Sequence, residues 1–259
     1  MPVRKKVVRR RKRKTTRRPR TNLMRAVKQI VMKNTETKQA TLQYNTTAFN
    51  SGINGPGDQM QVLPPVGVGT SQYQRIGASI KPIKLVIRGF IQYKTDNNAG
   101  ARMIGVRQFC YSDKTVSSYG TNTLAGSNFQ LLDIGSSSQN FTGTSLNYNT
   151  PHNKDQFRFY SDRKHVIMKP YGLTNTLSPS ATTELTSVDK SMYKSFIITI
   201  PASKMPANLK YDDTNSISQP VNFAPFLSVG YCDLLGYTGD TTNTQILTTW
   251  VSTLYYKDA

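Results

Sequence analysis

The chain has 259 residues and a formal net charge of +20, with 34 basic and 14 acidic side chains. This balance points to a polyanionic partner, nucleic acid first and an anionic membrane surface second. No apolar run approaches the roughly 18 residues of a spanning helix, and the N-terminus lacks the apolar core of a signal peptide. We therefore expect no membrane insertion.

The positive charge is concentrated in an N-terminal arm. Residues 1–20 contain twelve Lys or Arg and no acid, and the first carboxylate is that of Glu36. Repulsion among these charges, with few apolar side chains to bury, predicts that the arm is disordered when free. Binding to phosphates through such an arm is salt-sensitive and nearly blind to sequence. The arm also fits a nuclear-import signal, as Lys/Arg runs do.

Residues 21–33 predict a short basic amphipathic helix, with Leu23, Val27 and Ile30 on one face. A partly ordered extension of the arm is the alternative, because an isolated helix this short is marginal in water. We assign 1–35 to the arm. Its predicted nucleic-acid-binding residues are the basic ones: Arg4, Lys5, Lys6, Arg9, Arg10, Arg11, Lys12, Arg13, Lys14, Arg17, Arg18, Arg20, Arg25, Lys28 and Lys33.

The rest of the chain, 36–259, predicts an all-β body. It is rich in Thr, Ser, Asn, Ile, Val and Tyr and contains few strong helix formers. Alternation is clearest around Leu85, which shares one face with other apolar residues while Lys84 and Arg88 share the other. Seven strands are expected, with a guessed eighth near 208–211. The seven are 38–49, 81–95, 101–112, 156–168, 194–200, 223–234 and 245–256.

The segments between these strands carry further expectations. The turn after 81–95 predicts a hairpin with 101–112, whose second strand is apolar on both faces and central in its sheet. The Gly/Pro-rich segment 51–70 should hold no regular structure. The polar stretch 113–155 predicts a long loop insertion with helical turns near 129–132. Antiparallel strands with long, uneven loops indicate a single eight-stranded antiparallel jelly roll.

Cysteines and histidines are sparse. Cys110 and Cys232 have no metal-ligand spacing, so we expect small apolar side chains in a reducing compartment. His152 and His165 occur without a nucleophile-elbow motif and are expected on the surface or at an interface. We therefore expect no catalytic site.

An acidic pair, two tyrosines and a glycine-rich segment are also considered as binding sites. The pair Asp212-Asp213 predicts a solvated turn, with a Ca²⁺ site at a subunit contact as the alternative. Tyr44 and Tyr93 are expected in the core or at an interface, with base stacking as the alternative. The glycines at 67–77 precede a strand and lack Gly-Lys-Ser/Thr, so they form no phosphate-binding P-loop. We expect no cofactor and no metal.

Four segments, in order along the chain, resemble the capsid proteins of circular Rep-encoding single-stranded DNA (CRESS-DNA) viruses, the circoviruses among them. The first is the basic arm. The second, GTSQYQRIGASI at 69–80, matches a Gly…Gln-x-x-Arg-Ile-Gly pattern through Gly69, Gln72, Arg75, Ile76 and Gly77. The third, FRFYSDRKHVI at 157–167, is similar to an aromatic-Asp-Arg/Lys strand, and the fourth is the aromatic ending LYYKDA at 254–259.

The resemblance implies a single jelly roll of the viral capsid type in residues 36–259. It implies a T = 1 icosahedral shell of sixty copies with arms inward around a single-stranded DNA genome. Host nuclear import machinery would be a second partner, with the protein in the host nucleus during assembly and then in the virion. The alternatives are the coat protein of a small satellite virus with an RNA genome and a cellular nucleic-acid-binding protein with a basic tail.

Overall fold

The structure is a computed structural model that describes Met24, Val27 and residues 36–49, 51–53, 58–93, 103–119, 130–168, 192–212, 218–234 and 246–258. The chain divides into two units, Met1–Glu36 and Thr37–Ala259. In the first unit Met24 and Val27, two positions of the predicted helix, are helical and exposed. The other positions of that helix, and the predicted disorder of the arm, lie outside the described residues.

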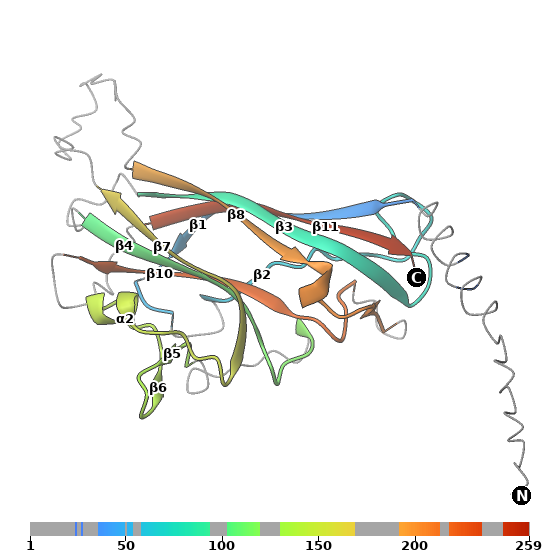
Figure 1. Ribbon diagram of the computed structural model, residues 1–259. Coiled ribbons are helices and arrows are strands. Elements are labelled where there is room, and N and C mark those ends of the chain that lie inside the picture. The colour runs from blue at the N-terminus through green and yellow to red at the C-terminus, as the bar shows by residue number, and fades with distance from the viewer. Residues whose placement is uncertain are drawn as a thin grey trace, which may run out of the picture. The chain divides into compact units, whose positions relative to one another are not determined.

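The second unit is a sandwich of two antiparallel sheets (Figure 1). The first sheet has the order β1-β11-β3-β8 and the second has the order β2-β10-β4-β7. The first comprises β1 (Lys38–Phe49), β11 (Ile246–Asp258), β3 (Ser79–Tyr93) and β8 (Tyr193–Pro201). The second comprises β2 (Met60–Gln61), β10 (Pro225–Asp233), β4 (Met103–Asp113) and β7 (Phe157–Met168).

These eight strands follow the path of a jelly roll. The chain crosses between the sheets after β1, β2 and β3, stays in the second sheet from β4 to β7, and then crosses after β7, β8 and β10. The predicted all-β jelly-roll class is therefore confirmed. Short elements complete the fold: β9 (Leu209–Lys210) pairs with β3, η5 (Ala202–Lys204) follows β8, and β5 (Leu132–Asp133) pairs with β6 (Ser138–Gln139).

Alternating side chains place the core between the sheets. In β3 the side chains of Leu85 and Ile87 are fully buried, whereas Lys84 and Arg88 are exposed, as the alternation predicts. Trp250 of β11 is the largest fully buried side chain. Its ring stacks on that of Tyr44 with a centroid distance of 4.2 Å, and its Nε1 donates to Met60 Sδ at 3.3 Å. Tyr44 thus packs against the core, which is the first of the two roles expected for it, the alternative being base stacking.

The predicted hairpin of 81–95 with 101–112 is wrong. Strand β3 pairs with β11 and β8, whereas β4 lies in the other sheet between β10 and β7. The prediction failed because a short link can also cross between packed sheets. Nine residues separate the two strands, which is ample for the roughly 10 Å between stacked sheets. The prediction that β4 is central and buried on both faces is confirmed.

Two other predictions need correction. The eighth strand of the jelly roll is β2, inside the segment 51–70 that was expected to be irregular; Met60 and Gln61 pair with Leu227 and Phe226 of β10. A two-residue strand is too short to produce a detectable alternation. The guessed strand near 208–211 exists as β9, but it only extends the pairing of β3.

The helical turns predicted near 129–132 are wrong, since Leu132 begins β5. The described part of this region contains the helix α2 (Ser145–Asn149), which begins after Thr144 because the Thr144 side chain accepts a hydrogen bond from the Asn147 backbone N–H. Sequence analysis missed it because the helix is only one turn long.

Residues 51–53 and 130–153, which we call the covering layer, pack on the outer face of the second sheet, where α2, β5 and β6 lie beneath β10 (Figure 1). Ile53 N donates to Phe141 O at 2.7 Å, and the Phe141 and Phe109 rings meet edge to face at 6.1 Å. A Cβ added at Gly230 would lie 2.6 Å from the Phe141 ring, so glycine permits this close approach. The predicted loop insertion therefore includes a packed layer on the second sheet, in which β4 and β10 are buried on both faces.

Candidate nucleic-acid interface

The predicted nucleic-acid-binding residues belong to the arm. All fifteen of them, from Arg4 to Lys33, lie outside the described residues. The structure therefore bears on the interface from Lys38 onward, where the chain enters the first sheet. Three features of the body are relevant: the start of β1, the outer face of the first sheet, and a pocket at one end of the sandwich.

The start of β1 is fixed by an ion pair. Lys38 Nζ lies 2.7 Å from Asp258 Oδ2 at the end of β11, and both side chains are largely buried. The same ammonium donates to Gln74 O at 3.0 Å. Antiparallel pairing brings these ends together, since Lys38 is opposite Tyr256. A strand that continues a long charged segment is thus anchored at its first residue by a charge-assisted contact.

The segment 69–80, which carries the resemblance to capsid proteins, packs beside this anchor. Arg75 is 2% exposed and its guanidinium lies 4.4 Å from the centroid of the Tyr211 ring. The backbone closes a loop through Gly69 N to Arg75 O at 3.0 Å, and Ile76 N donates to Asp258 Oδ1 at 3.2 Å. The motif therefore stabilises the end of β11 that also holds Lys38, which is a structural role.

The outer face of the first sheet differs from that of the second in its exposure. Along β8, buried and more exposed residues alternate. In β3, Lys84 and Arg88 are exposed and point outward, whereas Val86, between them on the same face, is 3% exposed. We call this surface the open face; it comprises the outward side chains of β1, β11, β3 and β8. It combines cations, aromatic rings and Thr/Ser hydroxyls, which are side chains that contact phosphates and bases.

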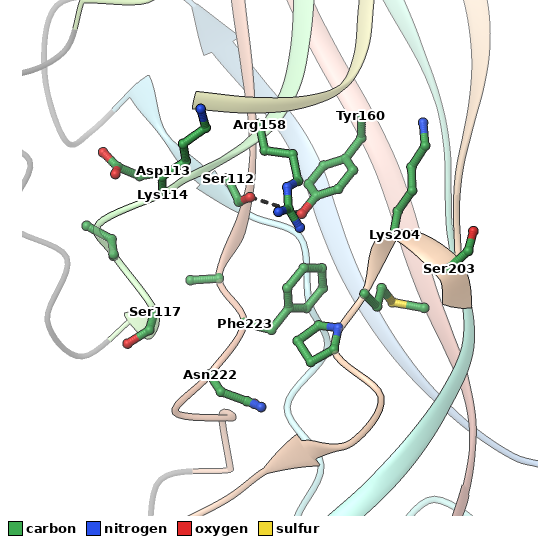
Figure 2. Close-up of a pocket in the computed structure, with 14 residues that line it drawn as sticks. Ser112, Asp113, Lys114, Ser117, Arg158, Tyr160, Ser203, Lys204, Asn222 and Phe223 are labelled. Atoms are coloured by element: carbon green, nitrogen blue, oxygen red, sulfur yellow. Dashed lines mark hydrogen bonds between the residues drawn. The ribbon is translucent and has the colours of Figure 1, made fainter. Parts of the chain in front are cut away.

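A pocket of about 320 Å³ lies between the end of β4, the start of β7, η5 and the segment before β10. Its base is apolar, formed by Met205, Pro206 and Phe223 among others. Figure 2 shows the Arg158 guanidinium beside the hydrogen bond of 2.9 Å between the Ser112 and Tyr160 hydroxyls.

The other cations of this pocket do not converge with Arg158. Lys114 Nζ donates to the carbonyls of Lys154 and Asp155 at 2.7 and 3.0 Å, and the Lys204 ammonium points away in Figure 2. A phosphate site is built from several donors aimed at one point. One guanidinium above an apolar base does not meet that requirement, so we assign the pocket no ligand.

Asp162, in the third segment that carries the resemblance, has a partner inside the fold. Its carboxylate accepts two hydrogen bonds from the buried guanidinium of Arg107. One of its oxygens, Oδ2, also lies 2.9 Å from His152 Nδ1. Burial raises the pKa of Asp162, but the hydrogen bonds and charge of Arg107, with His152, outweigh it and hold that pKa below the usual value of 3.8. Sequence reasoning missed this network because its members are spread over 55 residues.

The cysteines and the carboxylate pair are placed as follows. Cys110 and Cys232 are both free and buried, which confirms the prediction of small apolar side chains. Asp212 follows β9, and Asp213 lies outside the described residues. Among the described residues there is no group of three or more His, Cys, Asp or Glu that could hold a metal ion. No helix in this described part is long and apolar enough to cross a membrane.

No protein-family model matches the chain. No curated protein is significantly similar to it either.

Proposed function

We propose that this chain is a viral capsid protein that self-assembles into a T = 1 icosahedral shell and packages single-stranded DNA through its basic arm. The observation that carries the proposal is one combination: an eight-stranded jelly roll whose first strand directly continues an arm with twelve charges in twenty residues. Jelly rolls occur in capsids, lectins and cupins, so the fold alone does not decide between them. The arm adds the requirement for a polyanion.

The charge supports this function in magnitude. Sixty arms of twelve charges each would carry about 720 positive charges into a closed shell. Since each nucleotide has one phosphate charge, these arms would neutralise about 720 nucleotides. This is a substantial part of a genome of roughly one to two kilobases. Phosphate contacts of this kind ignore base sequence, which suits a protein that must coat a whole genome.

The anchor at Lys38 supports the same function mechanically. Tension on an arm bound to nucleic acid would act on the first residue of β1. There the Lys38–Asp258 ion pair and pairing with β11 oppose it. The arm can therefore hold nucleic acid without unzipping the sheet.

The first test is assembly. The expressed chain is separated by size-exclusion chromatography with absorbance at 260 and 280 nm, and the void peak is imaged by negative stain. Uniform closed particles with an elevated 260/280 ratio support the proposal, and digestion of the extracted cargo with DNase or RNase identifies it. A monomer or dimer that gains absorbance at 260 nm only when nucleic acid is added would favour the cellular binding protein instead.

The second test isolates the charge of the arm. In one variant all twelve basic residues of 1–20 become Gln, and in the matched control every Arg among them becomes Lys, which conserves charge. We expect the control to package as much nucleic acid as the wild type and the Gln variant to form shells that contain much less. Equal cargo in the two variants would refute a charge-based arm.

A further inference from the structure

The outer faces of the two sheets differ in how much of each is packed against other segments of the chain. In the second sheet, β4 and β10 are buried along almost their whole length because the covering layer packs on them. The first sheet carries no comparable layer within the described ranges, and the outward residues of β8 are exposed one after another. An uncovered sheet face in a protein that covers its other face calls for an explanation.

The centre of the open face is apolar and aromatic around one guanidinium. Arg88 of β3 lies in register between Val251 of β11 and Ile197 of β8, whose side chain is 56% exposed. Two residues further along β3, Phe90 is 37% exposed, and Tyr193 at the start of β8 is 43% exposed. Exposed rings beside a cation form a surface on which bases can stack.

The charges of this face have one sign. Across the four strands the sole carboxylate is that of Asp258, which pairs with Lys38. The ammonium of Lys84, on β3, lies 4.8 Å from the centroid of the Tyr255 ring. Arg88 follows Lys84 about 14 Å further along the same strand. Two outward cations with no carboxylate on the face favour a polyanion over an ordinary protein surface.

We propose that the open face is a second binding surface for single-stranded nucleic acid, in which Lys84 and Arg88 contact phosphates and Phe90 and Tyr193 stack on bases. The proposal rests on the proposed function, since it names where the packaged strand meets the shell beyond the arm. A second copy of this face is a poorer occupant, because a two-fold contact would bring Arg88 of one copy towards like charges of the other. Unpaired bases, unlike a duplex, present the rings that exposed aromatic residues can meet.

The test compares two charge-matched variants of the full-length chain. Lys84→Gln/Arg88→Gln removes two cations from the open face, and Lys154→Gln/Lys164→Gln removes two exposed cations from elsewhere on the body. Binding of a fluorescent oligo-dT is measured by anisotropy from low to high salt. Because each phosphate contact to a single strand contributes about 0.7 to the salt slope of log K, the first variant should lose about 1.4 and the second close to none.

A third variant tests the stacking. Phe90→Ala should weaken oligo-dT binding by about tenfold while leaving the salt slope unchanged, because a lost stack removes no phosphate contact. Circular dichroism and elution volume establish that each variant is folded. After ultraviolet irradiation of the wild-type complex, cross-linked peptides should include those that contain Phe90 or Tyr193.

The outcomes separate this proposal from the proposed function. Equal salt slopes for the two double variants, or cross-links confined to the arm, would overturn the open-face site while the arm variants still decide packaging. If Phe90→Ala prevents particle formation and leaves oligo-dT binding unchanged, the face is a subunit contact and the proposal is wrong. If no particles form but the slopes differ as expected, the face binds single strands and the capsid proposal fails alone.

Discussion

Arg107 and Asp162 form a two-point ion pair between β4 and β7. Arg107 Nε donates to Asp162 Oδ1 at 3.0 Å, and Nη2 donates to Oδ2 at 2.7 Å. The remaining amino group, Nη1, donates to the carbonyls of Asn147 and Thr150 at 2.7 and 2.6 Å. Those carbonyls lie at the end of α2, so one buried guanidinium joins the sheet to the covering layer.

Replacing this guanidinium should destabilise the body strongly. Arg107→Met keeps an apolar stem of similar length but leaves two carbonyls without the guanidinium donor and the Asp162 carboxylate with His152 alone. Removing one partner of a buried pair costs about 3 kcal/mol or more. We expect the free energy of unfolding of the unassembled chain, measured by urea denaturation, to fall by that amount.

Lys164→Gln is the matched control for this change. Lys164 is exposed and lies directly opposite Arg107 in the register of β4 and β7. Its loss should cost less than about 0.5 kcal/mol, as surface substitutions usually do. If Arg107→Met were no more destabilising than Lys164→Gln, the guanidinium would not be holding the covering layer.

His165 should make stability depend on pH. Burial lowers its pKa below the usual 6.5, and the charges of Arg163 and Lys194 lower it further. The folded state therefore holds fewer protons than the unfolded state between the folded pKa and 6.5. Stability from this group is complete above pH 6.5 and is lost as the pH falls from there through the folded pKa.

Urea denaturation from about pH 7.5 down to about pH 5 should thus show a decline that begins near pH 6.5. His165→Gln removes the titrating group and should flatten the profile in this window. His152→Gln is the comparison variant, since its partner Asp162 faces the covering layer. A wild-type profile that is already flat, or one that His165→Gln leaves unchanged, would contradict this assignment.

Much of the fold could be predicted from alternation. The seven long strands, including β4 with both faces buried, carry enough residues for a pattern to emerge, and Lys84, Leu85 and Arg88 lie as that pattern requires. What could not be predicted is which sheet a strand joins, because β3 and β4 are close in sequence and pair with different partners. Register between distant segments depends on packing that local sequence does not encode.

The candidate interface divides in the same way. The arm was identified from composition alone, since twelve charges in twenty residues need no structure to interpret. The open face was not identified, although Phe90 and Arg88 were visible in the sequence. Alternation shows that a face is outward, but whether another segment covers it depends on the tertiary fold, as the covering layer on the second sheet demonstrates.

Gly89 should be irreplaceable within the core. A Cβ added there would lie 2.4 Å from Thr249 O and 2.5 Å from Trp250 Cβ, so the backbones of β3 and β11 would have to separate. Such overpacking costs about 1–3 kcal/mol or more. Gly89→Ala is therefore expected to lower the free energy of unfolding by at least that amount in urea denaturation.

Gly67→Ala provides the control for Gly89→Ala, because a Cβ at Gly67 meets no atom within 4 Å. It should change stability by less than about 0.5 kcal/mol, or raise it slightly through the unfolded chain. Equal effects of the two substitutions would mean that β3 and β11 do not approach as closely as the structure has them.

The two cysteines should be unreactive in the folded chain. Burial raises the pKa of the Cys110 thiol to about 12 and that of Cys232 to about 11, whereas a free cysteine titrates near 8.5. The thiolate is the nucleophile, and at pH 8 neither residue supplies it in quantity. A maleimide should therefore label neither cysteine in the native protein and both in urea.

Ser195→Cys places a thiol on the exposed part of β8 and should label quickly under native conditions, as a positive control. If Cys110 or Cys232 reacted at the rate of that control, the second sheet would be opening to solvent and the close packing of β4 and β10 would be refuted.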